Sequence, residues 1–299
     1  MKRYNIQLST VLLVSIISFS LSVKAQIQVK DDSGNLISLK QPARKVISLS
    51  PGLTELLYAA GGAEYIQGVV SFSDYPEAAR KLPQIGSYNA LDMEKILILQ
   101  PDLVVAWKSG NPQHQIQQLK KLGLAVYISE PGDFMDIPRS IRQLGKLMAT
   151  QNVAEQSARD FTEQFEQLKQ SYKNRDNVQE KRTFIQIWNN PVMTVNQEHL
   201  ISKVISLCGG RNIFAQTGGL THTPTIEAIL QQDPQIIIAT GMAESSAIWL
   251  QRWQQWPFLS AVKNNRLYAA NPNHLVRHTP RILLGIKEVC QLIKTTPIP

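Results

Sequence analysis

The sequence has little of the chemistry that enzymes use. No segment fits Gly-x-Ser-x-Gly, Gly-x-Gly-x-x-Gly, a P-loop or His-Glu-x-x-His, the patterns that position a nucleophile, a nucleotide or a zinc ion. The only two cysteines, Cys208 and Cys290, lie too far apart in the chain for a zinc-binding pair. These absences argue against an enzyme, so we expect no catalytic residues, no cofactor and no metal site.

The chain also lacks blocks of like charge and low-complexity tracts. Its 299 residues include 31 lysines and arginines and 23 acidic residues, which give a net charge of +8. Because the basic residues are scattered and are not clustered with aromatic ones, the sequence predicts no nucleic-acid surface. Hydrophobic residues make up 43% of the chain. This share indicates a substantial core, and the length allows two domains.

A long apolar run stands at the N-terminus. Lys2 and Arg3 precede an apolar stretch that is interrupted by serines and ends with Val-Lys-Ala at 23–25. This pattern is typical of a signal peptide that is cleaved after Ala25, and it predicts export to the periplasm. An uncleaved membrane anchor is the alternative, because the stretch is near the lower length limit of a membrane span. The serines and the Val-x-Ala ending favour cleavage, so we interpret residues 1–25 as a signal peptide.

The cysteine pair fits an exported protein. In an oxidising compartment an even number of cysteines favours a disulfide, here between Cys208 and Cys290. Such a bond would close a loop of about 80 residues and would contribute at most about 4–5 kcal/mol on the chain-entropy model. Two buried free thiols are the alternative, which export to an oxidising compartment disfavours.

Strand-like and helix-like segments alternate in two similar halves of the sequence. This alternation predicts parallel βα units instead of a β-sandwich. Helix-like segments in each half end at Gly-Gly pairs, at 61–62 and at 209–210, as expected for helix C-terminal caps. The strand-like segments are 44–50, 66–73, 101–107 and 124–129 in the first half, and 181–188, 234–240 and 266–272 in the second.

A single long helix is predicted between the halves. Within 153–172 the residues Ala154, Ala158, Phe161, Phe165, Leu168 and Tyr172 recur at spacings of four and three, and no glycine or proline interrupts them. This is one apolar stripe along one helix. We therefore predict an α/β protein of two βα-type lobes with central sheets, joined by one rigid helix that disfavours large hinge closure. The predicted ranges are 26–135 for the N-terminal lobe, 136–175 for the connecting region and 176–299 for the C-terminal lobe.

Four stretches resemble a known family. They read "VISLSPGLTELLYAAGG", "SFSDYPEAARKLPQIGSYNALDMEKILILQPDLVVAWKSGN", "CGGRNIF" and "HTPRILLGIKEVC". Together they are similar to the periplasmic cobalamin-binding proteins, the substrate-binding components of vitamin B12 ABC importers, over about residues 44–293. The resemblance implies two α/β lobes joined by a long helix, cobalamin as the bound ligand, and a permease/ATPase complex in the inner membrane as partner. We expect a monomer. Haem, siderophore and some metal-binding proteins share this class and remain alternatives.

Aromatic residues stand where predicted strands end. Phe72 and Trp107 close strands of the first half, Trp188 closes the opening strand of the second half, and Tyr88 lies in a loop just before a helix. Parallel sheets bind ligands outside the carboxyl ends of their strands, so these residues predict an aromatic ligand surface. Core packing is the alternative for any one of them. In the family that the chain resembles, the matching positions line the site of the corrin ring.

Two further positions rest on the resemblance. Arg277 matches an arginine that contacts the polar periphery of cobalamin, and a guanidinium suits amide and phosphate acceptors. Asn273 stands where the family has an aspartate, and Thr221 or His222 stands where it has a tryptophan. We include Asn273 and Arg277 among the predicted ligand-binding residues. The two departures could alter ligand preference or affinity.

Glu94 and Glu227 occupy equivalent places in the two halves. Each follows a residue that can cap a helix, Asp92 or Thr225, and so falls in a first helical turn. Complementarity to the helix dipole explains such acids without any partner. Two carboxylates on one rim could also meet two arginine sites of a two-fold permease, and the family docks through the matching glutamates.

The five histidines give weak support for a metal or haem site. They are His114, His199, His222, His274 and His278. His274 and His278 have the i, i+4 spacing that chelates metals on a helix, but Thr279-Pro280 predicts that the helix begins after them and that they lie on a loop. A metal-binding variant is therefore disfavoured. Haem with a histidine or tyrosine axial ligand is the closer alternative, and an exported enzyme that uses the same cleft is a more distant one.

Overall fold

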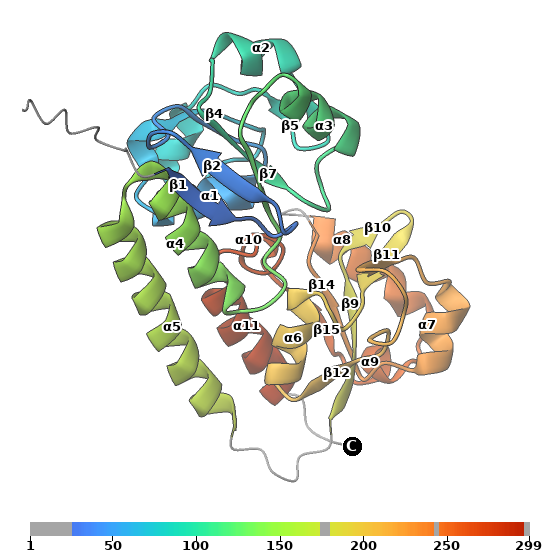
Figure 1. The fold of residues 1–299 in the computed structure, drawn as a ribbon. Coiled ribbons are helices and arrows are strands. Elements are labelled where there is room, and N and C mark those ends of the chain that lie inside the picture. The colour runs from blue at the N-terminus through green and yellow to red at the C-terminus, as the bar shows by residue number, and fades with distance from the viewer. Residues whose placement is uncertain (1–25, 174–179, 242–244, 296–299) are drawn as a thin grey trace, which may run out of the picture.

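The computed structural model describes residues 26–173, 180–241 and 245–295. These residues form two lobes, each built on a four-stranded parallel sheet, with a long helix along one side (Figure 1). The predicted signal peptide, residues 1–25, lies outside the described residues. Among the residues that are described, no helix has both the length and the apolar character that a membrane span requires.

The first lobe has strand order β4-β3-β7-β8. Alternate residues of the strands face opposite helical layers, because side chains of a strand alternate between its two faces. Val46, Leu103 and Val105 pack against helices α1 and α4, whereas Ile47 and Val104 pack against α2 and α3. The elements are β3 (Val46–Ser48), α1 (Pro51–Ala59), η1 (Ala63–Tyr65), β4 (Ile66–Val69), η2 (Glu77–Lys81), α2 (Met93–Ile98), β7 (Leu103–Trp107), α3 (Gln113–Lys121), β8 (Val126–Ser129) and α4 (Asp136–Met148).

Two small antiparallel hairpins complete this lobe. β1 (Ile27–Lys30) pairs with β2 (Leu36–Leu39), and the hairpin packs on α4. β5 (Gly86–Ser87) pairs with β6 (Ala90–Leu91). The second hairpin turns at Tyr88, which places that residue beside the end of the central sheet.

The second lobe repeats the arrangement, with strand order β12-β9-β14-β15 and a small antiparallel sheet β10-β11-β13. Helices α6 and α11 cover one face of the parallel sheet, and α7, α9 and η3 cover the other. The elements are β9 (Lys181–Gln186), β10 (Trp188–Asn189), β11 (Val192–Val195), α6 (Leu200–Leu207), β12 (Gly210–Asn212), β13 (Thr221–His222), α7 (Ile226–Gln232), β14 (Ile236–Ala239), α8 (Ser245–Gln251), η3 (Arg252–Gln255), α9 (Ser260–Lys263), β15 (Leu267–Ala269), α10 (Pro272–Leu275) and α11 (Ile282–Thr295).

The predicted connecting helix is present as α5 (Gln151–Lys173). Ala154, Ala158, Phe161 and Phe165 of its apolar stripe are buried, while Leu168 and Tyr172 pack at the core's edge. α5 contacts α4 and α1 of the first lobe and α11 and α6 of the second, so one hydrophobic cluster continues from lobe to lobe. α4, within the predicted connecting region, packs on the first lobe. The predicted boundary at residue 175 lies outside the described residues, and the domain ranges stay a prediction.

The predicted disulfide between Cys208 and Cys290 is confirmed. Cys208 caps the C-terminus of α6 and Cys290 lies in α11, with 4.5 Å between their Cα atoms. Both residues are fully buried. The bond therefore ties together the two helices that cover one face of the second sheet.

Two predicted strand ends were wrong. β4 ends at Val69, so Phe72 lies beyond the strand, where the backbone reverses with a φ of 65° at Phe72. β9 ends at Gln186, because the Ile187 amide donates to Met193 and Trp188 begins a separate hairpin. The loop predicted at 274–278 is also corrected in part: α10 includes His274, whereas His278 precedes α11 as expected.

The disulfide leads to a first prediction. Reductant should lower the urea concentration at which half of the mature chain is unfolded. The disulfide limits the conformational entropy of the unfolded chain, so its reduction should lower the free energy of unfolding by at most about 4.5 kcal/mol. The variant Cys208→Ala/Cys290→Ala should unfold at a lower midpoint that reductant does not change. Equilibrium unfolding followed by circular dichroism provides the measurement. An equal response of both proteins to reductant would show that the sulfurs are not bonded.

Candidate functional site

The first lobe presents a pair of aromatic rings at the carboxyl edge of its sheet. Trp107 is the last residue of β7, and Tyr88 occupies the turn of the β5–β6 hairpin. Their ring centroids lie 5.7 Å apart and their planes are tilted by 52°. Tyr88 is 40% exposed, and Trp107 is half-buried. The two rings therefore form one aromatic surface at the edge where parallel sheets bind ligands.

The indole of Trp107 is fixed from two sides. Its ring lies against the backbone of Gly110, where a Cβ atom would come within 1.9 Å of the indole Cε3. The indole Nε1–H donates to Glu130 Oε1 over 3.2 Å, and the second carboxylate oxygen of Glu130 accepts from the Ser109 amide over 2.8 Å. Only glycine at position 110 leaves room for this ring orientation.

Phe72 is exposed because its backbone is constrained. Its φ of 65° is unusual for a bulky residue and costs on the order of 1–3 kcal/mol. The Phe72 carbonyl accepts from the amide of Asp74 over 3.0 Å and from Arg277 Nη2 over 3.1 Å. The side chain is left 61% exposed, so this turn displays an aromatic ring instead of burying it.

The second lobe has its own aromatic pair. Trp188 of β10 is 44% exposed and meets Trp249 of α8 edge to face, with 6.3 Å between centroids. The Trp188 Nε1–H donates to the Asn190 carbonyl over 3.2 Å. Trp249 is buried against Gly241, where a Cβ would lie 2.2 Å from the ring. Trp188 therefore rests on a rigid base in its own lobe.

Arg277 joins the two lobes through an ion network. Its Nη1 donates to Glu55 Oε1 over 3.1 Å and to Asp74 Oδ1 over 2.6 Å. Burial alone would raise the pKa of Asp74, but the hydrogen bond and charge of Arg277 bring it below its ordinary value. The structure therefore pairs Arg277 with first-lobe acids. Its predicted contact with a ligand stays a prediction.

Glu55 is the centre of this network. Its side chain is 2% exposed. Oε2 accepts from Thr279 Oγ1 over 2.8 Å and from Arg281 Nε over 2.9 Å. Oε1 accepts from Nη2 of Arg281 and from Nη1 of Arg277. Arg281 also lies over the ring of Tyr75, 4.1 Å from its centroid, a cation–π contact. Glu55, Asp74, Tyr75 and Arg281 were not identified from the sequence. A charged residue inside the apolar helix segment "LTELLYA" was the available signal, since buried charges are paired.

Histidines and a second ion pair lie at the same contact between lobes. His278 Nδ1 is 2.8 Å from the Pro131 carbonyl, and its ring meets that of His199 with 4.9 Å between centroids. Each residue keeps some surface exposure, but the Nε2 atom of His278 is buried. Burial lowers the pKa of both imidazoles. Lys203 Nζ bonds Asp133 Oδ2 over 2.6 Å across the same contact.

The two predicted docking glutamates are exposed in first helical turns. Asp92 caps α2 by accepting from the Lys95 amide, and Thr225 caps α7 by accepting from the Ala228 amide. Glu94 and Glu227 follow these caps and face solvent. α2 lies at the top of the first lobe, and α7 lies on the side of the second lobe away from α5 (Figure 1). The local geometry is as predicted, and the docking role stays a prediction.

The other positions singled out from the resemblance lie in the second lobe. Asn273 is in the first turn of α10, where its backbone N–H donates to Oδ1 of Asn271 over 3.0 Å. Thr221 and His222 form β13 and pair with β11. His222 packs its ring 5.9 Å from that of Phe214. No group of three or more metal-ligating side chains occurs among residues 26–173, 180–241 and 245–295.

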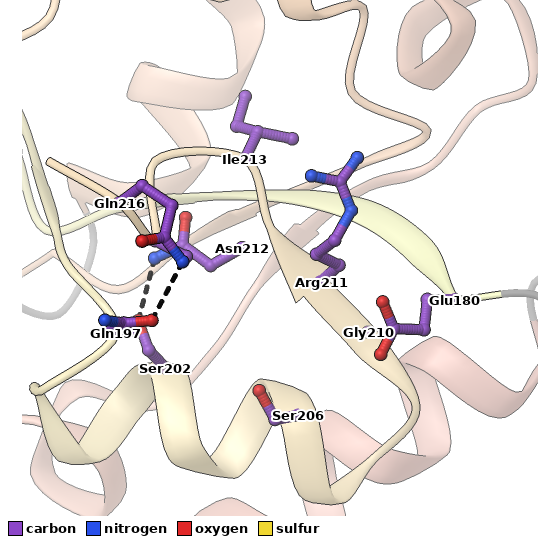
Figure 2. Close-up of a pocket in the computed structure, with 10 residues that line it drawn as sticks. Glu180, Gln197, Ser202, Ser206, Gly210, Arg211, Asn212, Ile213 and Gln216 are labelled. Carbon is purple, nitrogen blue, oxygen red and sulfur yellow. Dashed lines mark hydrogen bonds between the residues drawn. The ribbon is translucent and has the colours of Figure 1, made fainter.

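Two pockets within the described part of the chain are lined by other residues. Figure 2 shows one of about 260 Å³ between α6 and the β12 segment, where Gln216 Nε2 donates to Gln197 Oε1 over 3.0 Å. The other, of about 410 Å³, lies beside the β1–β2 turn and includes Asp32, Glu130 and Arg139. Neither lining contains a residue of the predicted aromatic set. The aromatic surface that the sequence predicts as the site is therefore separate from these two pockets, and its role stays a prediction.

The chain is similar to known proteins over most of its length. A family model described as periplasmic binding protein matches residues 46–273. The vitamin B12-binding protein of Vibrio parahaemolyticus is 35% identical over 258 residues, which cover 86% of this chain and 92% of that protein. The vitamin B12-binding protein of Yersinia pestis is 36% identical over 263 residues, which cover 87% and 89%.

Solved structures share the fold. The crystal structure of the periplasmic vitamin B12-binding protein BtuF of Vibrio cholerae matches with a TM-score of 0.79 and 36% identity, covering 85% of this chain and 98% of that one. The periplasmic haem-binding protein RhuT from Roseiflexus sp. RS-1 gives 0.75 at 19% identity, over 85% and 99%, a likeness that shows the fold alone. The predicted two-lobed α/β architecture is confirmed.

The network at Glu55 leads to a second prediction. Glu55→Gln should lower the free energy of unfolding by about 3–5 kcal/mol, because it removes a buried carboxylate and leaves two arginine side chains that are only 13% and 15% exposed with too little negative charge. Urea unfolding of the purified protein measures the loss. Glu155→Gln is the matched control, since the Glu155 pair with Arg142 is exposed and should have little effect. Equal losses in both variants would contradict a structural role for the network.

Proposed function

The chain belongs to the periplasmic binding protein family, and from this premise we propose that it captures cobalamin and delivers it to an ABC importer of the inner membrane. It is a binding protein and not an enzyme, as its family and its relatives are. The observation that carries the proposal is the display of aromatic rings at the carboxyl edges of both sheets: Phe72, Tyr88 and Trp107 in one lobe and Trp188 in the other.

The chemistry of a corrin ring suits this surface. A large macrocycle offers broad apolar faces to aromatic rings, and each Å² of apolar surface removed from water contributes about 25 cal/mol. Tyr88 and Trp107 are grouped, with 5.7 Å between their ring centroids, and grouped exposed apolar side chains are more indicative of a binding site than single ones. The ligand is cargo: binding requires no covalent step, and the protein releases the ligand unchanged.

Export and assembly state belong to the same proposal. The charged start, apolar stretch and Val-x-Ala ending of residues 1–25 support cleavage after Ala25, and the intact mass of protein recovered from the periplasm reports the cleavage position. The family is periplasmic. We expect the mature protein to act as a monomer that binds one ligand.

A titration tests the ligand and gives a third prediction. Isothermal calorimetry of the mature chain, residues 26–299, should show saturable one-to-one binding of cyanocobalamin. Trp107→Ala should weaken binding by about 30-fold or more, because truncating a central aromatic contact typically costs at least about 2 kcal/mol. The control is Phe258→Ala, which removes an aromatic side chain that is 67% exposed and precedes α9; its affinity should be unchanged.

Haem serves as the parallel titrant. Tight haem binding without a cobalamin response would keep the transport role and replace the proposed ligand. No binding of either titrant would contradict a corrinoid or haem as the ligand. Equal weakening of cobalamin binding in Trp107→Ala and Phe258→Ala would contradict the aromatic surface as the site.

Docking on the importer is proposed through Glu94 and Glu227. The two carboxylates occupy equivalent first-turn positions, one in each lobe, and both are exposed. Each lobe can therefore offer one negative charge to one half of a two-fold membrane partner. Their positions on separate lobes make both contacts available at once.

A fourth prediction follows for transport. In proteoliposomes that contain the cognate permease/ATPase complex, Glu94→Gln and Glu227→Gln should each reduce cobalamin uptake, and the double variant should reduce it further. Cobalamin affinity in calorimetry should not change, because neither residue belongs to the aromatic surface. Glu163→Gln, an exposed change on α5, is the control. Uptake by the double variant at the wild-type rate would exclude this docking mode.

A further inference from the structure

A buried amide connects the parts of the first-lobe aromatic surface. Asn111 is 4% exposed and follows the end of β7. Its Oδ1 accepts from the Trp107 amide over 2.6 Å, and its Nδ2 donates to the carbonyls of Leu49 over 2.8 Å and Tyr88 over 2.7 Å. Because these partners are one donor and two acceptors, only one orientation of the amide satisfies them all.

These three contacts come from three separate segments. Trp107 ends the central strand β7, Leu49 lies between β3 and α1, and Tyr88 is at the tip of the β5–β6 hairpin. Trp107 and Asn111 are joined a second time, because the backbone N–H of Asn111 donates to the Trp107 carbonyl over 3.1 Å. One side chain thus fixes the end of the sheet relative to the hairpin.

The hairpin needs such an anchor. Its strands are two residues each, Gly86–Ser87 and Ala90–Leu91, and so short a hairpin is marginal by itself. At its base, Gln115 of α3 exchanges two hydrogen bonds with the backbone of Leu91, both over 3.1 Å. At its tip, Asn111 holds the backbone of Tyr88. The bonds to Leu91 hold the base of the hairpin, and the bond at the tip holds the backbone that carries the tyrosine ring.

We propose that Asn111 is the positioning residue of the ligand surface, acting through Tyr88 and Trp107 and not through contact with the ligand. The inference rests on the proposed function and deepens it. The buried side-chain amide holds the backbones that carry the two rings in a fixed relative position before the ligand arrives. Cobalamin then meets a preformed surface, and ordering the hairpin subtracts less from the binding free energy.

The chain offers a matched control for this role. Asn212 in the second lobe is 3% exposed. Its Nδ2 donates to the Val195 carbonyl and to Ser202 Oγ, both over 2.7 Å. Its Oδ1 accepts from the backbone N–H of Phe214 over 3.0 Å. It is also a buried asparagine that bonds three groups, but it holds no residue of the aromatic surface. Asn212→Ala therefore reports the effect of losing a buried amide alone.

Calorimetry with cyanocobalamin forms the first test. Asn111→Ala should weaken binding by about tenfold, whereas Asn212→Ala should leave it unchanged at a comparable loss of thermal stability. In the Tyr88→Ala/Trp107→Ala background the effect of Asn111→Ala should shrink to about threefold or less, because coupled residues are not additive. An undiminished effect in that background, or equal effects of the two asparagine variants, would overturn the proposal. If Asn111→Ala does not fold, Asn111→Ser takes its place in the same cycle.

A second test needs no ligand. Hydrogen exchange of the ligand-free protein should become faster in Asn111→Ala for the segment 86–91 and for the amide of Trp107, and it should not change there in Asn212→Ala. If the wild-type protein binds no cobalamin but this exchange pattern is found, the ligand assignment fails and the positioning role stands. Unchanged exchange at 86–91 would overturn the positioning role, whatever the ligand is.

Discussion

The contact between the lobes depends on one buried carboxylate. Glu55 sits in a helix of the first lobe and accepts hydrogen bonds from Arg277, Thr279 and Arg281 of the second. A buried charge is tolerated only when it is paired in this way, so the network sets one relative position of the lobes. The hydrophobic cluster that runs through α5 into both lobes acts in the same direction. Together they fix how the exposed aromatic rings of the two lobes are placed relative to each other.

Three aromatic residues of the candidate site are each held by different local contacts. Trp107 lies on Gly110 and bonds Glu130, Tyr88 is anchored at its carbonyl, and Trp188 rests on Trp249. The contacts differ, but each restrains either the ring itself or, for Tyr88, the backbone that carries it. Preorganisation of this kind lowers the entropic cost of binding, as expected for a binding protein.

The architecture could be predicted from the sequence because it depends on short-range pattern. The apolar stripe of α5, the alternating strand and helix segments, and the caps at Asp92 and Thr225 are all local signals. The network at Glu55 could not be predicted, since its partners lie more than 220 residues away in the chain. The ends of the strands before Phe72 and Trp188 were misplaced for a related reason: a left-handed turn and a hairpin decide them, and apolar composition does not.

The hydrogen bond from Arg277 to the Phe72 carbonyl has a mechanical consequence. One end of this bond belongs to each lobe, and it helps to hold a backbone turn that is otherwise unfavourable. Separation of the lobes would break this bond and leave the Phe72 carbonyl with only the amide of Asp74 as donor. The conformation of the turn that exposes Phe72 is therefore mechanically coupled to the distance between the lobes.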